Sequence, residues 1–229
     1  MKRHLELHSR VSVMRDVILG GQDGLVNVLG IVLGVSAAST DNKILVAAAM
    51  SAAFAEAVSM AAVAYTSTMA EKDHFDKEEA REKLEVETKP QDEIKEIRDI
   101  YVAKGFNGQL LEDVVTHITS DKTRWVNIMM KEELGITRVN TTTVLWTAAT
   151  VGIAALIASF IPVFPFFLTT GIKAVAISLT VSAISLFAIG AYEAKTYVGS
   201  WKRSGVQLMI IGMGAATVGF LIGKIFHVN

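Results

Sequence analysis

The fold of this chain is decided by the stretch VILGGQDGLVNVLGIVLGVSAA, residues 17–38, in which Asp23 is the only charged residue. The hydrocarbon core of a bilayer is about 30 Å thick, and a helix needs about 20 apolar residues to cross it. Four more stretches have this length and character, at residues 44–69, 144–163, 166–191 and 206–226. The sequence therefore predicts an all-α membrane protein with five transmembrane helices.

A long polar segment separates the second predicted span from the third. Residues 71–133 contain 17 Asp and Glu against 11 Lys and Arg, although the net charge of the whole chain is only −1. We therefore expect three parts: residues 1–70 with the first two spans, an acidic helical insert at 71–140 that binds metal, and residues 141–229 with the last three spans.

Proline and glycine residues predict where the helices of the acidic insert begin and end. Its first part, EKDHFDKEEAREKLEVETK, has helix-forming composition and is expected to prolong the second span as far as Pro90. Further helices are predicted at residues 91–104, 109–118 and 121–134, with Gly135 as the C-terminal cap of the last one. Between the third and fourth spans, IPVFPFF at residues 161–167 predicts a tight turn, because proline ends a helix.

Basic residues near the span ends predict the orientation. They gather before the first span and between the fourth and fifth spans. The loops on the opposite side of the membrane, together with the tail 227–229, contain Lys43 as their only basic loop residue. Because basic loops stay in the cytosol, we expect the N-terminus and the acidic insert to be cytosolic. The short polar N-terminus favours a prokaryotic plasma membrane over a vacuole. The basic residues are Lys2, Arg3, Arg10, Arg15, Lys195, Lys202 and Arg203.

Several function classes find no support in the sequence. The chain has no cysteine, which excludes disulfides and thiolate metal sites. It has no phosphate-binding glycine loop, no nucleophile with its base and no nucleic-acid surface, so we expect neither an enzyme, a prosthetic group nor a nucleic-acid partner. A membrane di-iron oxidase would need two ExxH motifs on separate helices. Only one is present, from Glu71 to His74.

Two acidic residues lie well inside the predicted spans, Asp23 in the first and Glu56 in the second. A charge at the centre of a membrane helix costs at least about 2.5 kcal/mol, so a function is the default hypothesis. Asn27 follows Asp23 by one helical turn, and Met60 follows Glu56 by one turn. Carboxylate and thioether together suit a late transition metal better than magnesium or calcium. For Met60 alone, however, ordinary helix packing is the better explanation.

The acidic insert offers a second set of candidate ligands. Two ExxE pairs, Glu82/Glu85 and Glu93/Glu96, each place two carboxylates on one helix face, and a hairpin at Pro90 would gather all four. Further along, WVNIMMKEELG brings Met129, Met130 and Glu133 into one turn. The alternative is an ordinary solvated acidic surface. Basic residues available to neutralise it are Lys72, Lys77, Arg81, Lys83 and Lys95.

Glycines recur at four-residue spacing in the first span, at Gly20/Gly24 and Gly30/Gly34, and in the fifth, at Gly219/Gly223. Small residues allow membrane helices to approach closely. The pattern suggests that the first span meets its copy in a homodimer.

Taken together, these residues resemble the vacuolar iron transporter family, the iron and manganese carriers of yeast, plants and prokaryotes. The resemblance rests on RDVILGGQDGL at residues 15–25, AEAVSM at 55–60 and EKDHFDKEEAREKLE at 71–85, followed by the ExxE pair after Pro90 and by WVNIMMKEELG. These motifs occur in the family's order over nearly the whole chain. Plant members have a glutamate two turns before the methionine of AEAVSM, where this chain has Ala52, and Glu56 lies one turn nearer. The family's usual proline after the DGL segment is also missing here.

The resemblance implies a homodimeric carrier that exchanges cytosolic ferrous ion for protons between the first spans of two subunits. Asp23 and Met60 match the family's pathway residues. The positions that match the family's metal-collecting residues are Glu82, Glu85, Glu93, Glu96, Met129, Met130 and Glu133. Manganous, zinc and cobaltous ions are alternative substrates. A membrane-anchored metal buffer or sensor is the main alternative to a transporter, although Asp23 and Glu56 within the membrane argue against it.

Overall fold

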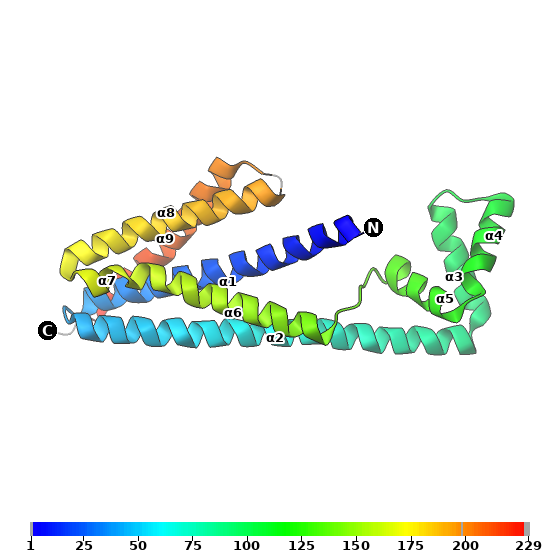
Figure 1. The fold of residues 1–229 in the computed structure, drawn as a ribbon, viewed down its shortest axis with the longest axis horizontal. Coiled ribbons are helices and arrows are strands. Elements are labelled where there is room, and N and C mark those ends of the chain that lie inside the picture. Colours follow the sequence, from blue (N-terminus) through cyan, green and yellow to red (C-terminus); the bar gives the residue numbers. More distant parts are fainter. Residues whose placement is uncertain (1, 198, 227–229) are drawn as a thin grey trace. The chain divides into compact units, whose positions relative to one another are not determined.

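The computed structural model describes the backbone of residues 2–197 and 199–226, and the side chains of residues 13–196 and 199–226. Every regular element in this described part is a helix (Figure 1). The side chains of Lys2, Arg3 and Arg10 and the tail 227–229, on which the predicted orientation partly rests, lie outside the described residues. The elements are α1 Lys2–Ala38, α2 Asn42–Thr88, α3 Pro90–Ala103, α4 Gly108–Thr119, α5 Lys122–Ile128, the π-helix η1 Met129–Glu133, α6 Thr141–Val163, α7 Pro165–Leu168, α8 Gly171–Tyr197 and α9 Trp201–Ile225.

The five predicted spans are confirmed. Five helices of the described chain are long and apolar enough to cross a membrane: Val13–Ala38, Asn42–Thr88, Thr141–Val163, Gly171–Thr196 and Trp201–Ile225. The fourth begins at Gly171 and not at residue 166, because the separate short helix α7 follows the turn at Pro165. Gly171 has a φ of 67°, which only glycine adopts without strain. Pro162 lies in the last turn of α6, so the helix ends just after it.

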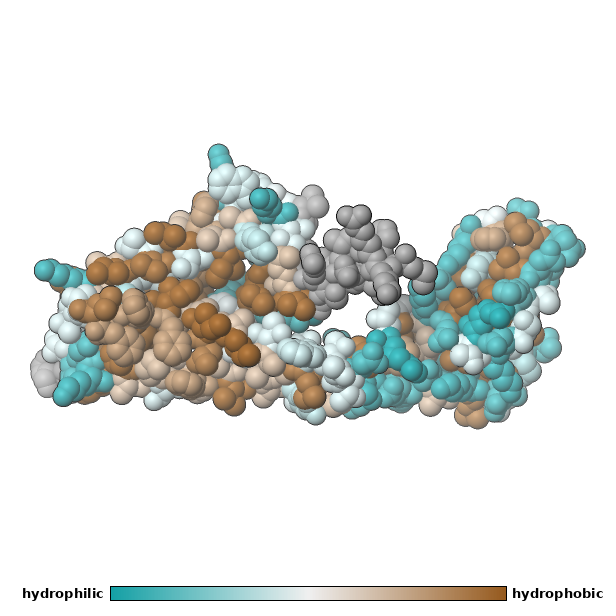
Figure 2. Space-filling view, viewed as in Figure 1, coloured by the Kyte–Doolittle hydropathy of each residue, from teal (hydrophilic) through white to brown (hydrophobic). Residues whose placement is uncertain are grey.

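The chain forms two compact units. The first consists of residues 1–65 and 145–229, and the second of residues 66–144, which contain the whole acidic insert. The continuous helix α2 confirms the prediction that the second span is prolonged to the proline at position 90. Hydrophobic side chains cover much of the visible face of the first unit, as expected of a surface in contact with lipid (Figure 2).

Small residues allow the helices of the first unit to pack closely. In Figure 1, α1, α8 and α9 run side by side, and α1 has extensive contacts with α9. The Cα of Gly34 lies so near α9 that a Cβ there would be 3.0 Å from the carbonyl oxygen of Gly219. Gly223 in turn faces the carbonyl oxygen of Gly34. Gly20 and Gly24 pack against Val151 and Ala155 of α6 in the same way.

These contacts change the interpretation of the glycine pattern. The spacing of the glycines correctly indicated a close helix contact. However, the pairs in α1 contact α6 and α9 of the same chain, so they give no support to a dimer. A sequence pattern of small residues identifies a close approach without identifying the partner helix.

Replacing Gly223 by Val should destabilise the first unit. The added Cβ would overlap the carbonyl oxygen of Gly34, which is backbone and cannot move aside without shifting α1. We expect a loss of ~1–3 kcal/mol or more, measured as a melting temperature lower by about 3–10 °C in detergent. The matched control is Gly214→Val on the same helix, where a Cβ meets no atom within 4 Å. Equal melting temperatures for the two variants would contradict this packing.

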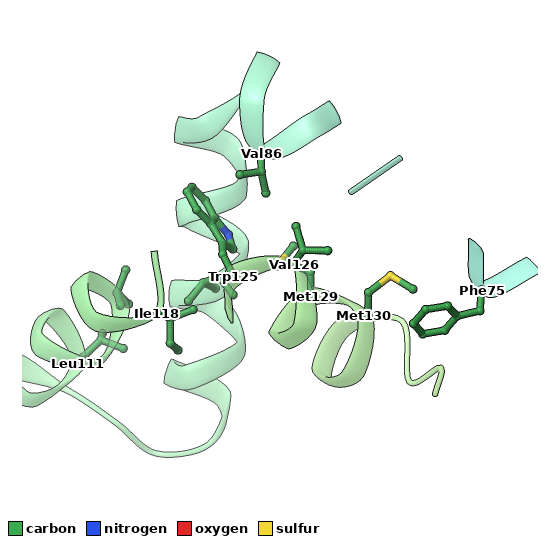
Figure 3. Close-up of a cluster of buried hydrophobic side chains, with 10 residues drawn as sticks. Phe75, Val86, Leu111, Ile118, Trp125, Val126, Met129 and Met130 are labelled. Atoms are coloured by element: carbon green, nitrogen blue, oxygen red, sulfur yellow. The ribbon is translucent and has the colours of Figure 1, made fainter. Parts of the chain in front are cut away.

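The acidic insert has its own hydrophobic core. Trp125 and Val126 of α5 pack with Met129 and Met130 of η1 and with Ile97 of α3 (Figure 3). Residues of α2 and α4 complete this core: Phe75, Val86, Leu111, Val115 and Ile118. The insert is therefore a small helical domain and not a solvated polar linker.

The insert helices follow the predicted ones closely, with one difference. Residues 121–134 do not form one α-helix, because α5 ends at Ile128 and the chain continues as the π-helix η1. The wider π turn is closed by the amide of Leu134, which donates to the carbonyl oxygen of Met129. Gly135 then ends the helix with a φ of 65°, as predicted.

Candidate functional site

The two carboxylic acids of the predicted spans lie together. Asp23 of α1 and Glu56 of α2 are within hydrogen-bonding reach of each other, and Asn27 also hydrogen-bonds to Glu56. Both acids are half-buried, and all three residues belong to the first unit. Three residues singled out separately from the sequence thus form one polar cluster between two membrane-spanning helices.

The close approach of Asp23 and Glu56 limits the negative charge that the pair can carry. An ionised carboxylate can only accept hydrogen bonds, so two of them cannot bond to each other unless one holds a proton. Two carboxylates that share one site also repel each other strongly when both are ionised. Two carboxylates this close are stable together only when a proton or a cation offsets their repulsion.

Met60 and Asn27 extend this cluster along their helices. Met60 is half-buried and follows Glu56 by one turn of α2. Asn27 is exposed, and so are Leu19 and Ile31 on the same face of α1. The polar cluster therefore lies beside a face of α1 that the described chain leaves open.

Sequence reasoning missed one buried acid. Asp16 is only 3% exposed in α1, seven residues before Asp23 and hence on the same side of the helix. Its carboxylate lies 3.5 Å from the guanidinium of Arg15 and receives a hydrogen bond from Thr147 of α6. The seven-residue spacing to Asp23 was the available signal, but Asp16 lies just before the first predicted span at residues 17–38.

The acidic insert contains a second group of carboxylates. Glu82 of α2 and Glu93 of α3 are 2% and 4% exposed, and each has a buried oxygen without a hydrogen-bond partner. A buried carboxylate oxygen without a partner is costly and calls for a missing cation, proton or water. The two most buried members of the predicted ExxE pairs are thus the ones whose hydrogen bonding is incomplete.

The raised pKa of Glu93 reflects the other carboxylates that lie near it. Burial, as the largest cause, and the nearby negative charges of Glu96, Glu82, Glu85 and Glu133 together raise the pKa of Glu93 to about 7. The pKa of Glu133 is raised too, by burial first and then by Glu96 and Glu82. The ExxE pairs and Glu133 therefore influence one another across α2, α3 and η1, as the hairpin prediction requires.

Basic residues neutralise only part of this group. Arg81 lies 3.0 Å from Glu82 and 3.5 Å from Glu85, and it also pairs with Glu78. Lys83 and Lys72 pair with Glu79 and Asp76, outside the ExxE pairs. An ordinary solvated surface, with its acids neutralised by basic residues, therefore describes the outer face of α2. Glu93 differs, because it has no ion pair with any side chain in the described part.

Met129 and Met130 lie in the hydrophobic core. They are 0% and 2% exposed, and Figure 3 places Met130 next to Phe75. Their packing is sufficient reason for apolar residues at both positions. Within the described residues, no three Asp, Glu or His side chains already stand in an arrangement that could hold a metal ion.

The comparison with known proteins decides the family. The model of the VIT family matches residues 14–224. The chain belongs to this family. A vacuolar iron transporter of Centaurea cyanus is 31% identical over 98% of this chain and 92% of its own length. Vacuolar iron transporter 1 of Arabidopsis thaliana is 29% identical over 98% of this chain and 91% of its own length.

A third relative gives the same result. A vacuolar iron transporter of Toxoplasma gondii is 30% identical over 98% of this chain and 78% of its own length. The resemblance noted from the motifs is therefore confirmed. Membership of the VIT family places this multi-pass membrane protein among transporters and not among enzymes.

Proposed function

We propose that this protein carries ferrous ion out of the cytosol in exchange for protons. The observation that carries the proposal is the Asp23–Glu56 pair, two carboxylic acids in hydrogen-bonding reach within the membrane-spanning helices. Such a pair holds either a proton or a cation. Mutual exclusion at one site is the physical basis of antiport. The names of the VIT relatives supply the identity of the cation.

The pathway is proposed to run past four residues. Asp23 and Glu56 supply charged oxygens, Asn27 an amide oxygen and Met60 a thioether sulfur. A thioether sulfur binds ferrous ion more readily than it binds magnesium or calcium ions. This difference gives the site its preference for transition metals. Manganous ion is the main alternative substrate, because oxygen-rich sites accept both ions.

The acidic insert is proposed to collect metal on the cytosolic side. Its support is the pair of buried, incompletely bonded carboxylates, Glu82 and Glu93, with Glu85, Glu96 and Glu133 nearby. Metal binding would relieve the repulsion among these groups. Met129 and Met130 are the least supported members of this set, since both already pack in the core.

A homodimer through α1 is proposed to complete the route. The face of α1 with Leu19, Asn27 and Ile31 is exposed in the single chain, although it carries a polar residue within the membrane. A second copy on this face would cover Asn27 and place two Asp23–Glu56 pairs on either side of the axis. A prokaryotic plasma membrane remains our expectation for its location.

Transport in proteoliposomes tests the function. With an inside-acid pH gradient and ferrous ion outside, protein oriented with the insert outward should accumulate iron, detected by a trapped chelating dye. Collapse of the gradient with a protonophore should stop accumulation. Competition by manganous ion measures the preference between the two metals. A membrane-anchored buffer or sensor would bind iron at the insert without filling the vesicles, and that result would refute the proposal.

A further inference from the structure

A cavity with a volume of about 600 Å³ lies in the second unit, between α2, α5 and the segment that leads to α6. We call it the insert cavity. Sites for small molecules commonly have volumes of about 300–1,000 Å³. The carboxylates proposed to collect metal are not among its lining residues within the described chain. The insert cavity is therefore a separate feature of the acidic insert.

Part of the lining of the insert cavity is apolar. Val86 of α2 and Val126 of α5 line it, and both belong to the hydrophobic core, where each is 4% exposed (Figure 3). Leu84 of α2 lines it as well, although this leucine is 60% exposed. An apolar molecule that covered Leu84 and the two valines would remove apolar surface from water, which favours binding.

The charged part of the lining has a positive surplus. Three basic side chains, those of Lys83, Lys122 and Arg138, face two acidic ones, Glu79 and Glu87. Lys122 pairs with Glu87 at 2.9 Å, whereas Glu79 is shared by Lys83 at 3.2 Å and Arg138 at 2.7 Å. One carboxylate balances only one of its two cations. The surplus is local, because residues 71–133 as a whole contain 17 acidic and 11 basic residues.

The two cations around Glu79 are accessible to a ligand. The side chains of Lys83 and Arg138 are each 61% exposed, whereas that of Glu79 is only 16% exposed. Arg138 donates to Glu79 through Nη2, and a guanidinium has five N–H donors in all. Its guanidinium also lies 5.5 Å from the centre of the Phe75 ring, a contact that orients it. An anion can therefore bind beside Glu79 without displacing it.

We propose that the insert cavity binds a small organic anion that has an apolar body and one carboxylate or sulfonate group. The anionic group binds Lys83 and Arg138, whose planar guanidinium suits such a group. The apolar body covers Leu84, Val86 and Val126. This site is separate from the metal pathway, and the inference does not depend on the proposed transport.

Fluorescence titration with dansylglycine tests this site. The probe combines an aromatic body with one carboxylate, and its emission rises when it leaves water. The full-length, metal-free protein is held in nanodiscs of phosphatidylcholine, which contain no anionic lipid, and empty nanodiscs give the background. Dansylamide has the same ring system without the carboxylate, so the protein should bind it at least about tenfold more weakly.

Two variants test the lining, each with a matched control. Lys83→Gln with Arg138→Gln should weaken dansylglycine binding by about tenfold. Leu84→Asp should weaken it as well, because the new carboxylate repels the probe. Lys95→Gln with Arg98→Gln removes the same charge from α3, which does not line the cavity, and Leu110→Asp alters a leucine of α4 that is also 60% exposed. Both controls should bind the probe as the wild type does.

The outcomes separate a built site from general attraction. Selective weakening in the two cavity variants would support the site. Equal weakening in the variants and their controls would overturn it, because the probe would then respond only to total charge or exposed apolar surface. Equal affinity for dansylglycine and dansylamide, or no signal above empty nanodiscs, would overturn it too. Iron transport plays no part in this measurement, so its failure would leave the proposed antiport untouched.

Discussion

Replacing Asp23 by Asn should reduce pH-driven iron flux to below about one hundredth of the wild-type rate. The amide of Asn has almost the size of the carboxyl group and keeps a hydrogen bond to Glu56 possible. However, it carries neither a negative charge for the metal nor a titrating proton. The measurement is the initial rate of iron accumulation in proteoliposomes under an imposed pH gradient.

The matched control for this substitution is Asp41→Asn. Asp41 is exposed, and its carboxylate accepts a hydrogen bond of 2.8 Å from the amide of Lys43 at the start of α2. Asn caps a helix about as well as Asp, so this variant should fold and transport normally. Iron flux in Asp23→Asn at the rate of Asp41→Asn would remove Asp23 from the mechanism.

The double substitution Glu82→Gln and Glu93→Gln should raise the iron concentration for half-maximal transport by about tenfold. The maximal rate should stay near that of the wild type, because the intramembrane pair is untouched. Both positions are buried and incompletely hydrogen-bonded, so they are expected to contribute most to metal capture. The measurement is iron flux over a range of iron concentrations at fixed pH.

The Glu93→Gln part of this variant has its own folding control. The pKa of Glu93 is raised to about 7 in the folded protein, above its value in an unfolded chain. The folded state therefore holds a proton that the unfolded state loses, and stability falls as the pH rises towards 7 and beyond. Glutamine cannot ionise, so Glu93→Gln should not lower the melting temperature of the metal-free protein at neutral pH.

A second pair of substitutions separates capture by this site from general attraction by negative charge. Glu87→Gln with Glu112→Gln removes the same charge from exposed positions, where Glu87 pairs with Lys122 and Glu112 with Arg98. If both double variants shifted the half-maximal concentration equally, the buried carboxylates would have no special role.

The architecture was predictable because it depends on local features. The length of each apolar stretch determines whether it can span a membrane, and α2 continues to Thr88 because no helix breaker precedes Pro90. Glycine also acts locally, and Gly135 adopts the positive φ expected of a helix cap. Such features need no knowledge of which helix packs against which.

The candidate site was predictable only in part, because it depends on contacts between helices. Asp23 and Glu56 were each conspicuous as acids in apolar surroundings, but no sequence pattern showed that they hydrogen-bond to each other. Gly34 and Gly223 indicated close packing without identifying each other as partners. Asp16 precedes the first predicted span, and the packing of α6 against α1 buries it.

In the acidic insert, α-helical periodicity does not predict the directions of all the side chains. Met129, Met130 and Glu133 were predicted to fall within one turn of an α-helix, whereas they lie in a π-helix whose wider turns change the directions of the side chains. Both methionines are also buried in the hydrophobic core of the insert with Trp125 and Val126. Sequence alone cannot weigh a ligand role against that packing.

The central claim is that the Asp23–Glu56 pair holds one proton that a metal ion displaces. Infrared difference spectroscopy on adding manganous ion tests it most directly, in a background with Glu93→Gln and Glu133→Gln, which removes the two insert carboxyls whose pKa is raised. Our account predicts that metal removes one protonated-carboxyl C=O band, and that the band change is absent when Asp23→Asn and Glu56→Gln are added. A band that metal leaves unchanged, or a band change that persists without both acids, would contradict it.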